Sequence, residues 1–334
     1  MQVLVLGGTG PTGRVIVENL LAGGHDVTVY HTGRHETAFS RDVEHIHGST
    51  RETAEMARAL EERRFDAAVN TGARVFAVLE ALPGRARRLI TISGNGRYKN
   101  MWSDDPSFAG VPLPVRESDP GWDDLEGHRF HTLVAQGEEA AFRAHQRGDL
   151  SVTALRYPLV YGPFANPPHE WYLVRRVLDR RTEVLLPGDG LMLPQRGHVR
   201  NLAHAVMLAL EHPAAEGKVY NVGDTRALTA RRISEVVADA LGHRWDLVPC
   251  PLSLWNGRNP LARNQSNLCD YFRIRAELGY EDVVDPETGT AEAARWMAAH
   301  PYERHGPEEQ AMHPQAFDYA AEDAVIAAMR AIQA

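Results

Sequence analysis

The sequence predicts an α/β fold, a Rossmann-like doubly wound parallel sheet followed by a smaller, mainly helical C-terminal domain. Short apolar runs alternate with helical patterns over the first 160 residues or so, which is typical of strand–helix–strand units with right-handed crossovers. The first of these units carries a glycine-rich turn. We therefore expect one domain over residues 1–163 and a second over residues 164–334, from which late strands return to the sheet.

Apolar periodicity predicts the individual elements. Strands are expected at residues 2–6, 26–30, 44–47, 66–70, 88–93, 150–156 and 218–222. Gly13, Ile16, Val17 and Leu20 recur on one face of a helix that ends at Gly23-Gly24. Further helices are expected at residues 53–62, 129–147, 171–180, 199–211, 229–241 and 291–300.

The overall composition narrows the class of protein. Hydrophobic residues make up 43% of the chain and the net charge is −8, as in an acidic globular protein. This charge does not favour a nucleic-acid partner. No apolar run is long enough to predict a membrane span, and two cysteines, Cys250 and Cys269, fit a reducing cytoplasm. A monomer or a homodimer is expected.

A phosphate-binding turn is predicted directly after the first strand. Gly7-Gly8-Thr9-Gly10-Pro11-Thr12-Gly13 contains G-x-G-x-x-G and opens an amphipathic helix. Glycines let the backbone approach a pyrophosphate, and the helix N-terminus supplies free N–H groups and the positive end of the dipole. The expected cofactor contacts in this turn are Gly7, Thr9, Gly10, Pro11, Thr12 and Gly13.

The end of the second strand indicates which dinucleotide binds. An NAD site normally places an acid there to hold the ribose 2′-hydroxyl. Here the strand ends in Tyr30-His31-Thr32-Gly33-Arg34, without an acid. The Arg34 guanidinium and the Thr32 hydroxyl can instead hold a 2′-phosphate. The predicted cofactor is therefore NADP, as NADPH.

Later segments, in order, resemble the extended short-chain dehydrogenase/reductase family, the NAD-dependent epimerase/dehydratase group. Asn70-Thr71-Gly72-Ala73 follows the fourth strand, and residues 155–163 (LRYPLVYGP) follow the sixth. Residues 195–203 (QRGHVRNLA) and 219–224 (VYNVGD) complete the set. The resemblance implies a Rossmann domain, a C-terminal substrate domain, and residues 156–159 beside the nicotinamide. It adds Thr71, Gly72, Tyr157 and Pro158 to the expected cofactor contacts.

The sequence departs from this family at the catalytic pair. The family carries Tyr-x-x-x-Lys on the helix before the sixth strand, with a Glu four residues after the Lys. Aligning that Glu with Glu138 puts Phe130 and Val134 at the pair, and a shift by one residue gives His131 and Ala135. Both members are then missing, so the resemblance is to an atypical member. Asn201 replaces the usual Asp of the later segment.

Three residues are candidates for the missing proton donor. Ser93 ends the fifth strand, Tyr98 follows in the loop, and His131 lies on the helix and titrates near neutrality. A metal site is not expected, because His45-x-His47 has no evident third ligand nearby. Aromatic residues that can stack on a flat substrate, or form core instead, are Trp102, Trp122, Trp171 and Tyr172.

Three functions are compatible with these features. The main prediction is an NADPH-dependent ketoreductase acting on a bulky carbonyl compound, as in the atypical extended reductases of antibiotic biosynthesis such as the angucyclinone (simocyclinone) type. The first alternative is a nucleotide-sugar epimerase or dehydratase, although its oxidation step needs a base. The second is a non-catalytic NADP-binding regulator or RNA-associated protein. The missing pair favours the second alternative over the first, and the charge weakens an RNA role.

Overall fold

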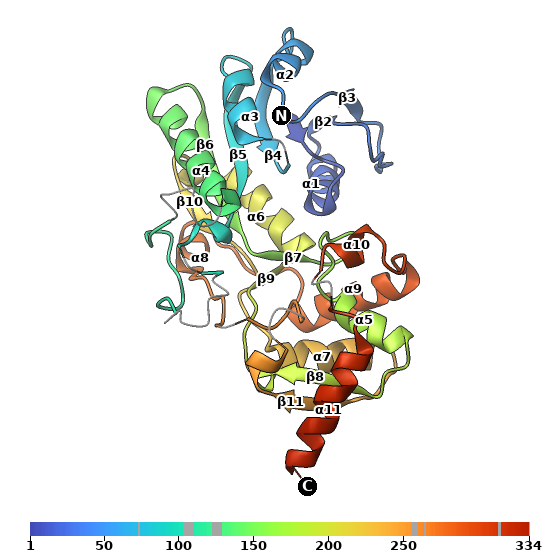
Figure 1. Cartoon of the computed structure of the whole chain (residues 1–334). Helices are drawn as coiled ribbons and strands as arrows, with labels where there is room; N and C mark the ends of the chain where they lie inside the picture. Colours follow the sequence, from blue (N-terminus) through green and yellow to red (C-terminus); the bar gives the residue numbers. More distant parts are fainter. Residues whose placement is uncertain are drawn as a thin grey trace.

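The computed structural model describes residues 1–72, 74–99, 101–102, 110–121, 129–255, 259–263, 265–312 and 315–333. Ala73 and Trp122, singled out above, lie outside them. Seven parallel strands form the main sheet in the order β10-β6-β5-β4-β1-β2-β3 (Figure 1). Their bounds are Gln2–Leu6 (β1), Asp26–His31 (β2), Glu44–His47 (β3), Phe65–Asn70 (β4), Ala86–Gly94 (β5), Ser151–Tyr157 (β6) and Val219–Asn221 (β10). The α/β, Rossmann-like prediction is confirmed.

The central strand β1 shows why the sheet has two covered faces. Val3 and Val5 pack in one core cluster with α1 and α6, and Leu4 and Leu6 pack in another with α2, α3 and α4. A strand buried on both faces reads as a continuous apolar run, as QVLVL does. The helices are Pro11–Ala22 (α1), Thr53–Ala59 (α2), Val75–Ala81 (α3), Arg129–Arg147 (α4) and Val199–Glu211 (α6).

Most of the remaining elements gather beyond the carboxyl edge of the main sheet, whereas the helix Phe272–Leu278 (α8) packs beside β10 (Figure 1). Two small parallel sheets pair β7 with β9 and β8 with β11. No helix in the described part of the chain is long and apolar enough to cross a membrane. The bounds are Leu159–Tyr161 (β7), Glu183–Pro187 (β8), Arg196–His198 (β9), Asp246–Cys250 (β11), Trp171–Leu178 (α5), Ala230–Ala240 (α7), Phe272–Leu278 (α8), Pro286–Ala299 (α9), Pro307–Gln310 (α10) and Tyr319–Gln333 (α11).

The aromatic residues of α5 form core. Trp171 and Tyr172 are fully buried and pack with residues of α7 and α9. The Trp171 indole donates to Glu309 at 3.1 Å, and the Tyr172 hydroxyl accepts from the indole of Trp255 at 3.0 Å. Neither ring is available to stack on a substrate. Of the two interpretations given for Trp171 and Tyr172, packing in the core therefore agrees with the structure.

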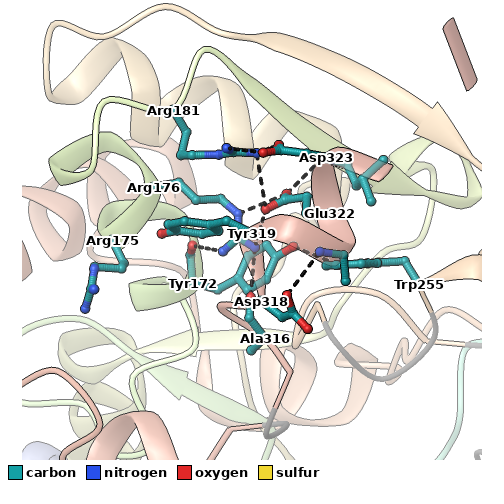
Figure 2. A network of polar contacts seen from close by, with 12 residues as sticks. Tyr172, Arg175, Arg176, Arg181, Trp255, Ala316, Asp318, Tyr319, Glu322 and Asp323 are labelled. Atoms are coloured by element: carbon teal, nitrogen blue, oxygen red, sulfur yellow. Dashed lines mark hydrogen bonds and ion pairs between the residues drawn. The ribbon is translucent and has the colours of Figure 1, made fainter. Parts of the chain in front are cut away.

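A buried ion pair joins α5 to α11 (Figure 2). Arg176 donates two hydrogen bonds to Glu322, at 3.2 and 3.0 Å, and both side chains are 0% exposed. The guanidinium also donates to the carbonyls of Tyr172 and Ala316 and lies 3.6 Å from the centre of the Tyr172 ring. The Leu185 amide of β8 donates to the same carboxylate at 3.3 Å. These bonds compensate both charges in a fully buried site.

Candidate functional site

The glycine turn between β1 and α1 is closed by its own backbone. The Gly7 amide donates to the Tyr30 carbonyl at 2.9 Å, and the Gly10 amide donates to the Gly7 carbonyl at 3.2 Å. Gly7 has a φ of +90°, a conformation that favours glycine. A Cβ on Gly13 would lie 2.7 Å from the Gly7 carbonyl oxygen, so only glycine fits at that crossing.

The N-terminus of α1 is open to a ligand. Its N-cap is Gly10, which has no side chain to cap the helix, and Pro11 takes the first turn without an N–H to satisfy. The amides of Thr12 and Gly13 belong to this uncapped turn. A Cβ on Gly10 would lie 3.6 Å from the Gly7 carbonyl oxygen, which is an ordinary contact, and would otherwise point into open space. An anionic group such as a pyrophosphate fits this cradle.

Thr71 and Gly72 lie beside the turn at the end of β4. The Thr71 hydroxyl is within 3.1 Å of the Leu6 carbonyl and 3.0 Å of the Gly7 carbonyl, to which it donates. This hydroxyl therefore ties β4 to the glycine turn. Gly72 leaves open space, since a Cβ there would approach only the Gly7 Cα, at 3.9 Å. Gly72 is thus the member of the predicted pair that leaves room for a ligand.

Arg14 and Phe164 are two further residues at the turn that sequence reasoning missed. Arg14 follows the last glycine, and its Nε donates to the Thr9 carbonyl at 2.9 Å. Its guanidinium lies 4.2 Å from the centre of the Phe164 ring. Phe164 follows β7, about 150 residues further along the chain, so this contact brings a cation and an aromatic ring to the glycine turn. The place of Arg14 directly after Gly13 could have indicated a role at the turn from the sequence, but its contact with Phe164 could not be predicted from the sequence.

Thr32 and Arg34, the residues expected to hold a 2′-phosphate, follow the end of β2 at His31. Both residues are exposed, and Gly33 between them has a φ of +74°. The first carboxylate after the strand is Glu36, which contacts three histidines and not the glycine turn.

The ends of β5 and β6 bring Ser93 and Tyr157 to the same edge. Ser93 pairs in register with Arg156, and Gly94 with Tyr157. The Ser93 Oγ is buried. The Tyr157 hydroxyl donates to the Leu202 carbonyl of α6 at 3.2 Å, so its ring turns into the core and leaves the backbone and Pro158 at the edge. Burial raises the pKa of Tyr157 above its ordinary value.

His131 and Phe130 begin α4, whose sequence RFHTLVAQGEEAAFRAHQR contains neither Tyr nor Lys. Phe130 is 73% exposed. His131 packs against Gly96, directly after the end of β5, where a Cβ would lie 3.0 Å from its ring. His131 and Ser93 therefore lie on neighbouring elements at the carboxyl edge of the sheet.

Tyr98 is placed differently from the expectation. Its side chain is 1% exposed, and its hydroxyl donates to Asn221 at 2.5 Å and accepts from Arg156 at 2.6 Å. Burial is the largest influence on its pKa and raises it, against the opposing effect of Arg156. A phenol held in two buried hydrogen bonds is a poor proton donor to a substrate, so this geometry indicates a structural role.

Arg156 centres a buried network beneath this edge. It donates to both carboxylate oxygens of Glu138, at 2.9 and 2.5 Å, and Arg97 donates to the same carboxylate at 3.2 Å. Burial alone would raise the pKa of Glu138, but the guanidinium of Arg156, helped by Arg97, holds it below its usual range. The network fixes α4 against β6 and thereby the position of His131.

Comparison with known proteins places this geometry in a family. The profile described as "NAD dependent epimerase/dehydratase family" matches residues 3–85 and 134–223, just over half of the chain. The chain belongs to this family. The match includes the glycine turn, the strands that carry Thr71 and Tyr157, and most of α4.

Relatives of this epimerase/dehydratase chain have several functions. The chloroplast stem-loop binding protein of 41 kDa b from Arabidopsis thaliana is 26% identical over 259 residues, which cover 72% of this chain and 63% of that protein. The UDP-glucose 4-epimerase of Corynebacterium glutamicum is 26% identical, covering 73% of this chain and 81% of the relative. The dTDP-glucose 4,6-dehydratase of an Actinoplanes species is 32% identical, but over only 51% of this chain and 53% of the relative.

Solved structures agree on the fold of this family member. The UDP-glucose 4-epimerase of Thermotoga maritima, with UDP-glucose, superposes with a TM-score of 0.73 over 90% of this chain and all of its own, at 18% identity. The UDP-glucose 4-epimerase of Thermus thermophilus in complex with NAD gives 0.68 at 23% identity, covering 89% and 98% of the two chains. At these identities the likeness establishes the fold alone.

Proposed function

We propose that the protein binds a nicotinamide dinucleotide at the glycine turn and acts as an oxidoreductase on the sugar of a nucleotide-linked substrate. The observation that carries the proposal is the uncapped start of α1 at Gly10, at the same sheet edge as Ser93 and His131. The open space at Gly10 and Gly72 fits a pyrophosphate. The sugar-nucleotide enzymes among the relatives support the substrate class.

When bound, the cofactor supplies or accepts the hydride. The chain has to bind it, orient the substrate and move a proton. The amides of Thr12 and Gly13, in the uncapped first turn of α1, would hold the phosphate oxygens of the cofactor. Ser93, whose hydroxyl is buried beside Glu138, would turn to the substrate oxygen and donate a hydrogen bond to it, and His131 would exchange the proton, directly or through water. Arg156 and Glu138 hold α4, and with it His131, in place.

This proposal replaces the polyketide ketoreductase as the main interpretation. The comparisons support the nucleotide-sugar alternative, and none of the relatives described above is a ketoreductase of that kind. A nucleotide-sugar epimerase or dehydratase needs a base for its oxidation step, and this chain has none at the Tyr-x-x-x-Lys positions. His131, which lies next to Phe130 on α4, supplies a titratable group at that place.

The test is conversion of UDP- and dTDP-linked sugars in the presence of NAD(H) or NADP(H), with chromatographic detection of an epimer or a keto product. We expect conversion by the wild-type protein. Ser93→Ala should lower turnover by about tenfold or more while cofactor binding stays the same, because it removes a hydrogen bond to the reacting oxygen. Ser93→Thr, which keeps the hydroxyl, is the matched control.

Two outcomes would contradict the proposal. Reduction of aromatic polyketide ketones without conversion of any nucleotide sugar would restore the ketoreductase interpretation. Tight cofactor binding with no conversion of either substrate class would favour a non-catalytic regulator.

We further propose NADP as the preferred cofactor, because exposed Arg34 follows β2 and no acid lies between His31, the last residue of that strand, and Arg34. Arg34→Ala should weaken NADPH binding by about tenfold or more, as expected for loss of a charged hydrogen bond of roughly 1.5–3 kcal/mol. NADH binding should hardly change. Calorimetric titration of both nucleotides measures the ratio, and equal loss for the two would exclude a 2′-phosphate contact.

The stem-loop-binding relative supports a second candidate, RNA association. The net charge of −8 opposes it, because RNA binding depends on neutralising phosphates. Gel-shift titration with an RNA stem-loop at low and physiological salt tests this function directly. Binding that survives physiological salt would establish it beside the redox function.

A further inference from the structure

A cluster of three histidines and one glutamate lies at the carboxyl end of β2 and β3. We call these residues, His31, Glu36, His45 and His47, the histidine cluster. The parallel register pairs Val29 with His45 and His31 with His47. Since side chains alternate along a strand, His45 and His47 share one face of β3, and His31 ends β2 on the same face. The register thus supplies the third ligand that the spacing of His45-x-His47 lacked.

The ligand atoms of the cluster converge on one point. The four atoms all lie within 4.8 Å of one another. His31 Nε2 is 2.9 Å from His45 Nδ1, and Glu36 Oε2 is 3.4 Å from the same Nδ1. Glu36 Oε1 is 3.0 Å from His47 Nε2. Ligands around a tetrahedral zinc ion with bonds of about 2.0–2.1 Å stand about 3.3 Å apart. The closer pairs therefore shift by tenths of an ångström, and a pair at the 4.8 Å limit closes by about 1.5 Å.

We propose that the histidine cluster binds one divalent transition-metal ion, with Zn²⁺ as the best fit. Three imidazole nitrogens and one carboxylate oxygen are a donor set that suits zinc and its neighbours, and not Mg²⁺ or Ca²⁺. The Glu36 carboxylate indicates that the histidine cluster binds a cation and not an anion. Its carboxylate lies within 3.9 Å of a ring nitrogen of each histidine, where it attracts a cation and repels a phosphate.

One side of the histidine cluster is buried in the protein and the other side faces solvent. The His31 ring is buried, whereas His47 and Glu36 are more than half exposed, so an ion can enter from solvent. Without an ion, His31 Nδ1 accepts from the Gly33 amide at 3.3 Å. The proton of the neutral ring is then on Nε2. Metal binding at Nε2 moves this proton to Nδ1, and the Gly33 amide must turn away.

This adjustment connects the ion to the neighbouring turn. Gly33, with its φ of +74°, lies between Thr32 and Arg34, the residues assigned to the ribose end of the cofactor. The bound ion therefore has a positioning role, because it fixes both ends of the segment from His31 to Glu36. The metal site itself does not depend on the proposed redox function.

The test is titration of the chelator-treated full chain, free of any affinity tag, with Zn²⁺ by calorimetry and with Co²⁺ by visible absorption. We expect one ion per chain and the strong absorption of tetrahedral cobalt. His45→Ala and His47→Ala should each weaken Zn²⁺ binding by more than the roughly 10–100-fold that loss of an outer-shell partner costs. His35→Ala is the matched control, because this exposed histidine of the same segment lies outside the cluster.

Three results would overturn the proposal. The first is absence of Zn²⁺ and Co²⁺ binding to a wild-type chain whose thermal unfolding shows it to be folded. The second is an equal loss of Zn²⁺ binding in His35→Ala and His45→Ala. The third is binding of 2′,5′-ADP to the metal-free chain that is lost in His45→Ala while no metal binds, which would make the cluster an anion site. The titrations use no cofactor or substrate, so their failure is distinct from failure of the proposed function.

Discussion

Replacing Glu322 by alanine is expected to lower the free energy of unfolding by about 3–5 kcal/mol, since this is the usual effect of removing one partner of a buried ion pair. The substitution leaves the Arg176 guanidinium charged in a site from which water is excluded. It also removes the acceptor of the Leu185 amide, so a backbone group of β8 loses its partner. Urea denaturation followed by circular dichroism measures the change.

Arg330→Ala is the matched control for Glu322→Ala. Arg330 lies on the same helix, and it pairs at the surface with Glu183 and Asp246, so its loss should cost at most about 1 kcal/mol. The double variant Arg176→Met with Glu322→Leu should recover much of the loss, because apolar packing replaces both charges. Equal destabilisation by Glu322→Ala and Arg330→Ala would show that the buried pair has no special role.

The second large effect concerns Gly10. Gly10→Val should weaken NADPH and NADH binding by about 100-fold or more, about 2.8 kcal/mol, while the fold is kept. The φ of −76° and ψ of 177° at Gly10 suit any residue, and a Cβ there meets no close neighbour. The added side chain instead fills the space into which the pyrophosphate has to come. Fluorescence titration with both nucleotides measures the loss.

Two other variants separate this effect from simple damage to α1. Ala22→Val places the same valine side chain at the exposed end of that helix and should leave nucleotide binding unchanged. Gly13→Ala should lower the thermal stability as well as the binding, because its Cβ would lie 2.7 Å from the Gly7 carbonyl oxygen. Unaltered nucleotide affinity in Gly10→Val would remove the glycine turn from the cofactor site.

Local patterns predicted the main sheet well. The strand at 2–6 and the helices at 129–147 and 199–211 have the predicted bounds. In each of them a clear pattern of apolar residues starts and stops at a distinct position in the sequence. The helix predicted at 291–300 begins earlier, at Pro286. The Asp285 side chain accepts from the Glu287 and Thr288 amides, and Pro286 follows it at the first turn. That capping signal was present in the sequence and was missed.

Elements that depend on distant partners were harder to predict. The five-residue strands β8 and β11 pair with each other although they lie about 60 residues apart in the sequence. Neither strand shows a clear alternation of apolar and polar residues. The site shows the same limit. The loop position of Tyr98 pointed to a proton donor, but its contacts with Asn221 and Arg156 come from segments far along the chain. The histidine cluster likewise exists only through the register of β2 with β3.

The return of β10 to the main sheet has a consequence for how the chain folds as it is synthesised. β10 pairs with β6, and α6 packs with α1 on one face of the sheet. A ribosome-bound chain that has emerged only as far as Pro163 has neither, so β6 is an unpaired edge and Val3 and Val5 lack part of their cover. The main sheet can therefore reach its final form only after Asn221, the last residue of β10, has left the exit tunnel. Until then, β6 presents an unpaired strand edge, a feature that makes nascent chains prone to aggregation.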